Sequence, residues 1–135
     1  MAVSTDDELA EILDLETIAV VGCSTTEGKA AHDIPKYLQQ QGYHVIPVNP
    51  FADEILGHEA ADSLVEVDEE IGVVDVFRPS DEVPGIVDEV VEREDVEAVW
   101  LQQGIRHDEA GERVVQSGRR FVQDRCMKVE HQRLK

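Results

Sequence analysis

Five short apolar runs, separated by segments with helical periodicity, restrict the fold of this chain more than any other feature. Each run is predicted to form a strand, and the runs occupy residues 17–21, 43–48, 72–77, 97–101 and 120–123. Helices are expected over residues 6–13 and 34–41, after Ser80, which is a suitable N-cap, and after His107. Alternating strands and helices predict a parallel sheet that is covered by helices on both faces.

The sequence predicts an α/β fold, as a single Rossmann-like domain over residues 1–135 with a five-stranded, mainly parallel sheet. Its length suits one domain with a substantial core. Right-handed crossovers leave few strand orders, of which we expect 3-2-1-4-5. The long connection at residues 49–67 is expected to hold a helical turn near residues 60–64. In the expected order, ligands bind beyond the carboxyl ends of the strands, at the switch point next to the first strand.

The chain is strongly acidic, with 30 acidic residues against 12 basic ones and a formal net charge of −18. The acids are spread along the whole sequence instead of forming a tail. Such a surface repels nucleic acids and anionic membranes, so we expect neither as a partner. The Debye length falls to about 3 Å near 1 M salt, so concentrated salt screens the repulsion among these acids. We therefore hypothesise a halophilic host, with an ordinary acidic protein as the alternative.

Targeting segments, cysteines and histidines give few functional signals. The N-terminal stretch MAVSTDDELAEIL is acidic where a secretory signal would be basic, and no apolar run is long enough for a membrane span, so we expect a soluble, cytoplasmic protein. Cys23 and Cys126 match no zinc spacing and indicate no disulfide framework. The histidines are scattered without a metal-ligand spacing, so no metal site is expected. His32 with Asp33 is the one pair to test for acid–base chemistry, and a helix-capping role is preferred.

The loop after the first predicted strand combines groups that suit a phosphate. Gly22 ends the strand, Ser24 to Thr26 supply three hydroxyl groups, and Lys29 supplies a positive charge. The next helix must begin close by, because Pro35 is best tolerated in a first turn. Free backbone N–H groups at a helix N-terminus bind anions. The alternative is that the glycines of this loop only turn the chain and that Lys29 is solvated.

The loop departs from the dinucleotide-binding signature. Its spacing is GxSxxxG instead of GxGxxG, and a NAD site also needs an acid at the end of the second strand for the ribose. The chain has Asn49 and Pro50 there, and the nearest acid is Asp53. This departure favours another phosphate-bearing nucleotide.

Five stretches in the same order carry a family resemblance. They are VGCS at residues 21–24, VNP at 48–50, VFRPSDEVPGIVDE at 76–89, VWLQQGI at 99–105 and DRCMKVEH at 124–131. Together they resemble the small stand-alone CoA-binding proteins, which are single Rossmann-like domains similar to the CoA-binding domain at the start of the succinyl-CoA synthetase α-subunit. The resemblance runs from about Ile18 to the C-terminus.

The resemblance implies a cofactor, coenzyme A, and a set of residues around it. The implied site consists of Gly22, Cys23, Ser24 and Lys29 at the phosphates, Asn49 and Pro50 beside the nucleotide, Phe77 and Arg78 as a wall over it, and Gln103 and Gly104 at its mouth. Physical reasoning supports Arg78 independently, because a guanidinium at the carboxyl edge of a sheet can pair bidentately with a phosphate.

We therefore expect a protein that binds CoA or an acyl-CoA without evident catalysis of its own. The phosphorylated histidine of succinyl-CoA synthetase belongs to a second domain that this sequence does not include. One alternative is an NAD(P)-binding module. Another is an interaction subunit that supplies a nucleotide domain to a partner enzyme or forms a homodimer. A third is an enzyme that uses the Cys23 thiol, although packing under the loop is the preferred role for that side chain.

Overall fold

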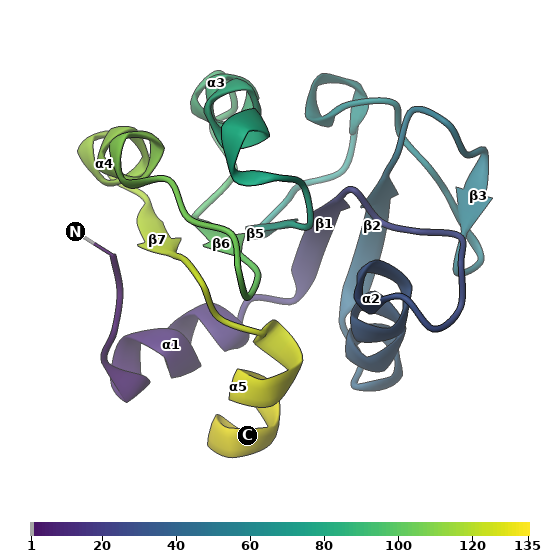
Figure 1. Cartoon of the computed structure of the whole chain (residues 1–135), viewed down its shortest axis with the longest axis horizontal. Helices are drawn as coiled ribbons and strands as arrows, with labels where there is room; N and C mark the ends of the chain where they lie inside the picture. Colours follow the sequence, from purple (N-terminus) through teal and green to yellow (C-terminus); the bar gives the residue numbers. More distant parts are fainter. Residues whose placement is uncertain (1) are drawn as a thin grey trace.

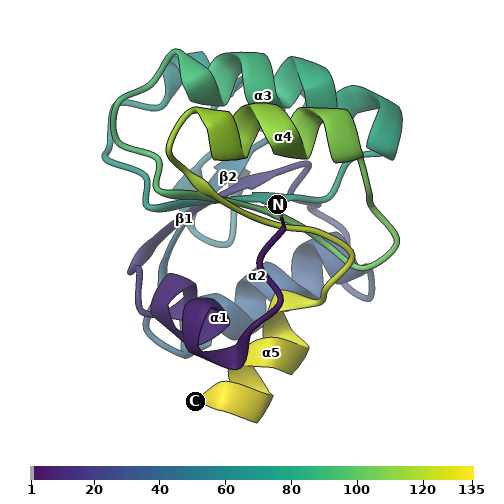
Figure 2. The same ribbon diagram turned by 90° about the vertical axis from the view of Figure 1, so that its left-hand side faces the viewer.

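A five-stranded parallel sheet forms the middle of three layers in the computed structural model, which describes residues 2–135 (Figures 1 and 2). Its strands are β1 (Thr17–Val21), β2 (His44–Val48), β5 (Val73–Val76), β6 (Ala98–Leu101) and β7 (Arg120–Val122). Helices cover both faces of the sheet (Figure 2). One face carries α3 (Val83–Val91) and α4 (Asp108–Gln116), and the other carries α1 (Asp6–Leu13), α2 (Ala30–Gln40) and α5 (Met127–Leu134). The predicted class and layering are confirmed.

The predicted strand order is wrong. The order in the sheet is β2-β1-β5-β6-β7, which is 2-1-3-4-5 when these strands are counted along the chain. The third strand, β5, pairs with β1 and not with β2. A proline in β2, Pro47, explains why: it has no N–H to donate, and the observed order leaves β2 at an edge of the large sheet, where proline is tolerated.

The long connection between β2 and β5 also differs from its prediction. It holds a small antiparallel hairpin, β3 (Glu54–Ile55) and β4 (His58–Glu59), and a 3-10 turn, η1 (Leu64–Glu66). Residues just after the hairpin run along the free edge of β2, where Ala61 donates its N–H to Pro47 O at 3.0 Å. The edge strand is thereby partly covered.

Strand side chains alternate between two apolar layers, as the pleat of a sheet requires. In β1, Ala19 packs in the layer with α3 and α4, whereas Ile18 and Val20 pack in the layer with α1, α2 and α5. Trp100 is fully buried in that second layer, and its indole N–H donates to Arg125 O at 2.8 Å. Both faces of the sheet are therefore dry, in agreement with the near-continuous apolar strands of the sequence.

Helix α2 begins four residues earlier than predicted, at Ala30, so Pro35 lies inside the helix and not in its first turn. Since Pro35 has no N–H, the carbonyl of Ala31 has no helical donor. The backbone N–H of Ser24 donates to this carbonyl at 2.9 Å. The proline therefore frees an acceptor that ties the loop after β1 to the helix.

Helix α1 spans the predicted residues 6–13, and the remaining helix boundaries bring a second confirmation, one correction and one omission. Helix α4 begins directly after His107, whose Nδ1 accepts the N–H of Ala110 at 3.1 Å. Ser80 is not an N-cap: it opens the short 3-10 helix η2 (Ser80–Glu82), and its hydroxyl oxygen accepts the Arg106 N–H at 3.0 Å. Helix α5 was not predicted. Among residues 2–135, no helix combines the length and the apolar character that crossing a bilayer requires.

Candidate ligand-binding site

A cavity of about 530 Å³ opens at the carboxyl ends of β1 and β5. These two strands are neighbours at the switch point of the sheet. From β1 the chain continues to β2 on one side of it, and the later strands, beginning with β5, lie on the other side of β1. Such a switch point is where ligands bind in open α/β sheets. Eight of the ten residues predicted for the site line the cavity, namely Gly22, Cys23, Ser24, Lys29, Asn49, Pro50, Phe77 and Arg78.

The two other predicted residues, Gln103 and Gly104, do not line this cavity. They follow β6, which is separated from β1 by β5. In the predicted order the fourth strand would lie directly beside the first, so their misplacement follows from the wrong order. The N–H of Gly104 donates to Asp124 Oδ1 at 2.7 Å. This hydrogen bond holds the turn beside Asp124 and outside the cavity.

Gly22 is required by both its backbone conformation and its surroundings. Its φ of +87° lies in the left-handed region, which side chains rarely adopt. A Cβ at this position would lie 2.7 Å from Arg78 Cδ and 3.2 Å from Phe77 O. The end of β5 therefore packs directly on the glycine, and the arginine side chain crosses over the loop.

The loop N–H groups are less available than the sequence indicates. Gly22 donates its N–H to Val48 O at 3.0 Å, and Ser24 donates its own to helix α2, as described above. The hydroxyl oxygen of Ser24 accepts the N–H of Thr26 at 3.0 Å, which leaves the hydroxyl proton free to donate outward. Side-chain donors thus take a larger share of any anion binding than the prediction assumed.

Arg78 is held by a neighbouring carboxylate. Its Nε donates to Glu82 Oε1 at 3.1 Å and its Nη2 to Glu82 Oε2 at 2.7 Å. The hydrogen bond from Arg78 lowers the pKa of Glu82, and the same contact raises the pKa of Arg78. This fork-to-fork geometry is the one in which a guanidinium binds a phosphate. Glu82 thus occupies the place of a bidentate acceptor.

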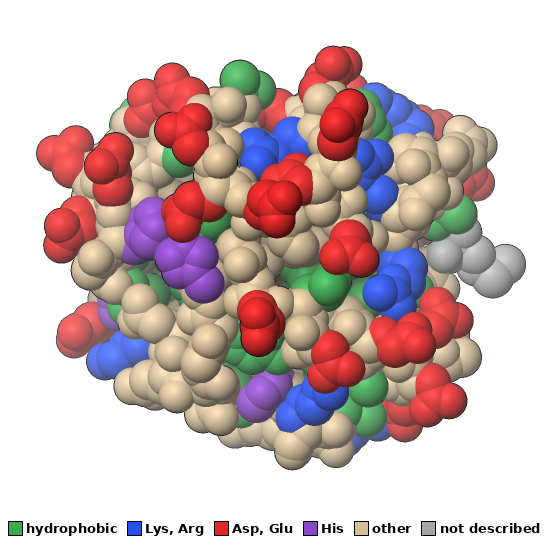
Figure 3. Space-filling view, turned by 180° about the vertical axis from the view of Figure 1, so that it is seen from behind, with side chains coloured by type: hydrophobic (Ala, Val, Ile, Leu, Met, Phe, Trp, Pro, Cys, Tyr) green, Lys and Arg blue, Asp and Glu red, His purple; other side chains and the backbone are tan. Residues whose placement is uncertain are grey.

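The cavity carries both signs of charge. Lys29 and Arg78 face the carboxylates of Asp62, Glu82 and Glu89 around the same space. Lys29 is exposed at the N-cap of α2. Acidic side chains are also scattered over the face seen in Figure 3. A negatively charged ligand must therefore bind through local contacts against the overall field of the protein.

Asn49 joins the two loops that frame the cavity. Its Nδ2 donates to Cys23 O at 2.9 Å, and its Oδ1 accepts the N–H of Phe51 at 2.8 Å. The turn that results places Pro50 and Phe51 at the rim, where Phe51 is 94% exposed. An exposed aromatic ring beside a cavity can stack on a nucleobase.

Comparison with known proteins identifies the family. A family model described as a CoA binding domain matches residues 16–132. The chain belongs to this family of CoA-binding domains. An uncharacterised relative, YneT of Bacillus subtilis (strain 168), is 42% identical over 125 residues, which are 92% of each chain.

Solved structures resemble this CoA-binding domain closely. A hypothetical protein from Pyrococcus horikoshii OT3 has a TM-score of 0.92 and 34% identity, covering 97% of this chain and 92% of that chain. A protein from Thermus thermophilus has a TM-score of 0.85 and 40% identity, covering 98% and 100%. An ADP-forming acetate–CoA ligase of Methanocaldococcus jannaschii is 33% identical over 84 residues, which are 62% of this chain but only 12% of the ligase. The CoA-binding domain thus corresponds to a small part of that much longer chain.

The thiol of Cys23 is turned into the core of the CoA-binding domain. The residue is fully buried among the side chains of the α1, α2 and α5 layer. Burial raises the pKa of the thiol to about 12, with a smaller contribution from the charge of Asp75. A thiol of this kind is protonated near neutral pH and is a poor nucleophile. The arrangement favours the packing role for Cys23.

The predicted pair of His32 and Asp33 lies at the start of α2. His32 Nδ1 is 3.3 Å from Asp33 Oδ1, and the same oxygen accepts the N–H of Gly28 at 3.1 Å. This hydrogen bond from Gly28, followed by the one from His32, lowers the pKa of Asp33. The carboxylate thus ties the loop to helix α2, but it accepts an N–H that lies outside the helix, and the N-cap residue Lys29 makes no side-chain cap hydrogen bond, so the preferred capping role is not borne out.

Several cavity residues were not predicted from the sequence. They come from the connection after β2 and from the helices after β5, and they are Asp62, Ser63, Leu64, Glu82, Ile86 and Glu89. The spacing of Arg78 and Glu82, four residues apart in a helix-forming segment, was a usable signal for their ion pair. Nothing local in the sequence marks Asp62 or Ser63, because their position depends on how the long connection folds back.

Proposed function

We propose that this protein binds coenzyme A or an acyl-CoA in the cavity at the carboxyl ends of β1 and β5. The observation that carries the proposal is the contact of Arg78 with Gly22 across the switch point of a CoA-binding domain. This contact places a guanidinium, which can bind a phosphate through two hydrogen bonds, over the loop that follows the first strand. The cavity volume is within the usual range for ligand sites, about 300–1,000 Å³.

In this proposal the phosphates contact Ser24, Lys29 and Arg78, while the nucleotide lies against Asn49 and Pro50. A phosphate takes the place of Glu82 on the guanidinium of Arg78, because both acceptors present two oxygens to the same fork. The cavity volume of about 530 Å³ suits part of a molecule as long as CoA, so the remainder extends past the rim.

The proposed role is binding and not catalysis. Cys23 presents no thiolate near neutral pH, and the charged groups of the cavity suit recognition of an anion. The ADP-forming acetate–CoA ligases carry a similar domain within far longer chains. We propose that this chain supplies the CoA-holding step alone, for a partner enzyme or for a reaction on another chain.

Calorimetric titration with CoA, acetyl-CoA, NAD and NADP tests the proposal. Wild type should bind CoA in preference to the two nicotinamide dinucleotides, and Gly22→Val should abolish binding because its side chain displaces Arg78. Gly118→Val is the matched control, since Gly118 has a nearly identical φ of +86° with open space around it, far along the chain. A preference for NAD, or equal CoA binding by both glycine variants, would contradict the proposal.

A further inference from the structure

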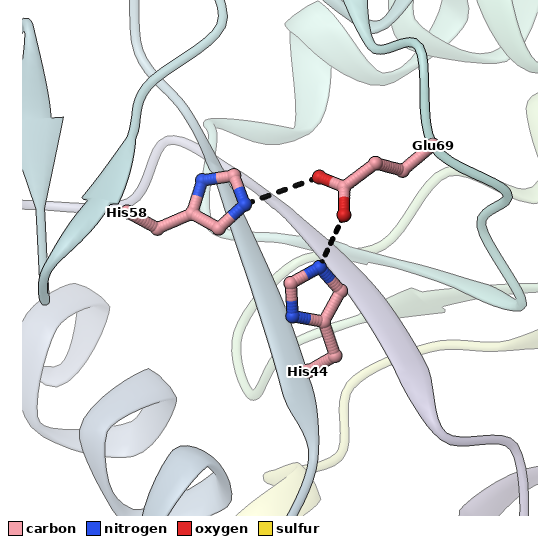
Figure 4. Close-up of side chains that lie close together, drawn as sticks. All are labelled: His44, His58 and Glu69. Atoms are coloured by element: carbon pink, nitrogen blue, oxygen red, sulfur yellow. Dashed lines mark hydrogen bonds and ion pairs between the residues drawn. The ribbon is translucent and has the colours of Figure 1, made fainter.

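Two histidines and a glutamate that lie far apart in the sequence converge beside β2, an edge strand of the large sheet (Figure 4). His44 opens β2, His58 opens β4, and Glu69 belongs to the loop before β5. His44 Nε2 is 2.6 Å from Glu69 Oε1, and His58 Nε2 is 3.1 Å from Glu69 Oε2. The expectation that the histidines are scattered is therefore wrong for this pair. Figure 3 shows histidine side chains side by side among acidic ones on this face.

The hydrogen bonding of His58 fixes which ring nitrogen faces the cluster with its lone pair. His58 Nδ1 lies 2.6 Å from the carbonyl oxygen of Glu59, and since a carbonyl only accepts, Nδ1 carries the proton and donates it. In the neutral ring Nε2 is then an acceptor, yet it points at Glu69 Oε2, which is also an acceptor. Two acceptors at this separation need a cation between them, either a proton or a metal ion.

We propose that His44, His58 and Glu69 form a binding site for a divalent transition metal ion of the Zn²⁺ class. Two imidazole nitrogens and a carboxylate are a ligand set that Zn²⁺ accepts, with water in the remaining position. Ligand atoms around tetrahedral Zn²⁺ lie about 3.3 Å apart, as metal–ligand bonds of about 2.0–2.1 Å require. The three ligand atoms here lie within 4.8 Å of one another, so small side-chain rotations complete the geometry.

The surroundings of the cluster support this assignment. A backbone carbonyl that orients a ligating histidine, as Glu59 O orients His58, is a common second layer of metal sites. The side chains of His44 and Glu69 are each 46% exposed and that of His58 is 27% exposed, which leaves an entry path and freedom to adjust. A neighbouring cavity of about 440 Å³ is lined by further acids, including Asp62, Glu66 and Asp68, so the local field attracts cations.

Metal binding would join three separate segments. Strand β2 is an edge of the large sheet, β4 belongs to the hairpin beside it, and Glu69 leads into β5. An ion shared by all three fixes the connection between β2 and β5 on the sheet. Residues of that same connection line the ligand cavity. The metal site does not depend on the proposed CoA binding, and it is tested without CoA.

The test is calorimetric titration of the chelator-treated full chain with ZnCl₂ and, separately, with MgCl₂. Wild type should bind one Zn²⁺ per chain and show no binding of Mg²⁺, because Mg²⁺ prefers oxygen ligands. Glu69→Gln and His58→Gln should each weaken Zn²⁺ binding by about a hundredfold or more, since each removes one of three protein ligands. Bound Co²⁺ should give a visible absorption spectrum of low-coordinate geometry, which both variants lose.

Glu70→Gln is the matched control, because it removes the same charge at the next residue and should leave Zn²⁺ affinity unchanged. Circular dichroism verifies that each variant is folded, and His44→Gln provides a third ligand variant if one of the others is not. Absence of Zn²⁺ binding by wild type would overturn the proposal and leave a proton as the cation of the cluster. Equal Zn²⁺ binding by wild type, Glu69→Gln and Glu70→Gln would also overturn it, because it would reflect only the acidic surface.

Discussion

Asp75 places an ionisable group in the middle of the sheet, and its replacement by asparagine should change how stability depends on pH. The residue is fully buried in β5, between Val20 of β1 and Trp100 of β6. One carboxylate oxygen accepts a hydrogen bond from Gln102 Nε2 at 2.9 Å, and the other has no hydrogen-bond partner within residues 2–135. Burial raises the pKa of Asp75 to about 7, and the hydrogen bond from Gln102 opposes this only in part.

The raised pKa sets the sign and the size of the effect. The native state holds the Asp75 proton more tightly than the unfolded chain, whose aspartate pKa is 3.8. The stabilisation from this proton is complete below the unfolded pKa and is lost as the pH rises through about 7. Between about pH 5 and pH 8, wild type should therefore lose about 2.5 kcal/mol relative to Asp75→Asn, which cannot ionise and keeps an acceptor for Gln102.

Urea unfolding at both pH values and constant salt measures this difference. The free energy of unfolding of Asp75→Asn minus that of wild type should grow by the stated amount from the lower to the higher pH. Asp81→Asn controls for the loss of one acidic side chain, because Asp81 is exposed, and its difference from wild type should stay constant. A constant difference for Asp75→Asn as well would refute the reasoning and would mean that the buried carboxyl does not titrate in this range.

Three further predictions concern the cavity, the packing and the charge. Glu82→Gln should tighten CoA binding by about fivefold, because it releases Arg78 from a solvent-exposed ion pair; calorimetry that gave weaker binding would contradict the proposed exchange. Gly111→Ala should lower the free energy of unfolding by about 1–2 kcal/mol, because its Cβ would lie 2.3 Å from the ring of Phe121. The matched Gly85→Ala, in open space on α3, should raise it by about 0.5 kcal/mol. Raising NaCl to about 1 M should increase the free energy of unfolding of wild type, because a shorter Debye length weakens the repulsion among acidic side chains. A decrease would oppose the halophilic hypothesis.

The sequence predicted the elements that depend on local patterns and failed where tertiary context decides. Apolar runs located all five strands of the large sheet, but strand order depends on which edge each crossover takes. Pro47 was a readable clue, because a proline that lacks a ladder donor suits an edge strand. Helix α5 was not predicted because its inner face carries a charged residue: Glu130 is buried there and pairs with Arg125 and Arg133. Such a buried ion network looks like a solvated face in the sequence.

The candidate site shows the same division. Eight of the ten predicted residues line the cavity, and all eight belong to the loops that begin where β1, β2 and β5 end, so the strand ends alone could locate them. The cluster of His44, His58 and Glu69 could not, because its three segments meet only after the long connection folds against the edge of β2. Sequence spacing finds ligands that share one helix or one loop, and here each ligand belongs to a different segment.

The hydrogen bonds of the loop after β1 define how the proposed site holds an anion. In a phosphate-binding nest, successive backbone N–H groups point at the ligand. Here Gly22 donates to Val48 O, Ser24 to Ala31 O and Gly28 to Asp33, so the fold itself takes these donors. Hydrogen bonds within the protein therefore hold the loop, and the proposed phosphate contacts fall to side chains, chiefly Arg78. Since that guanidinium is shared with a carboxylate, the proposed binding of an anion by this acidic protein would exchange one acceptor for another instead of filling an empty cradle.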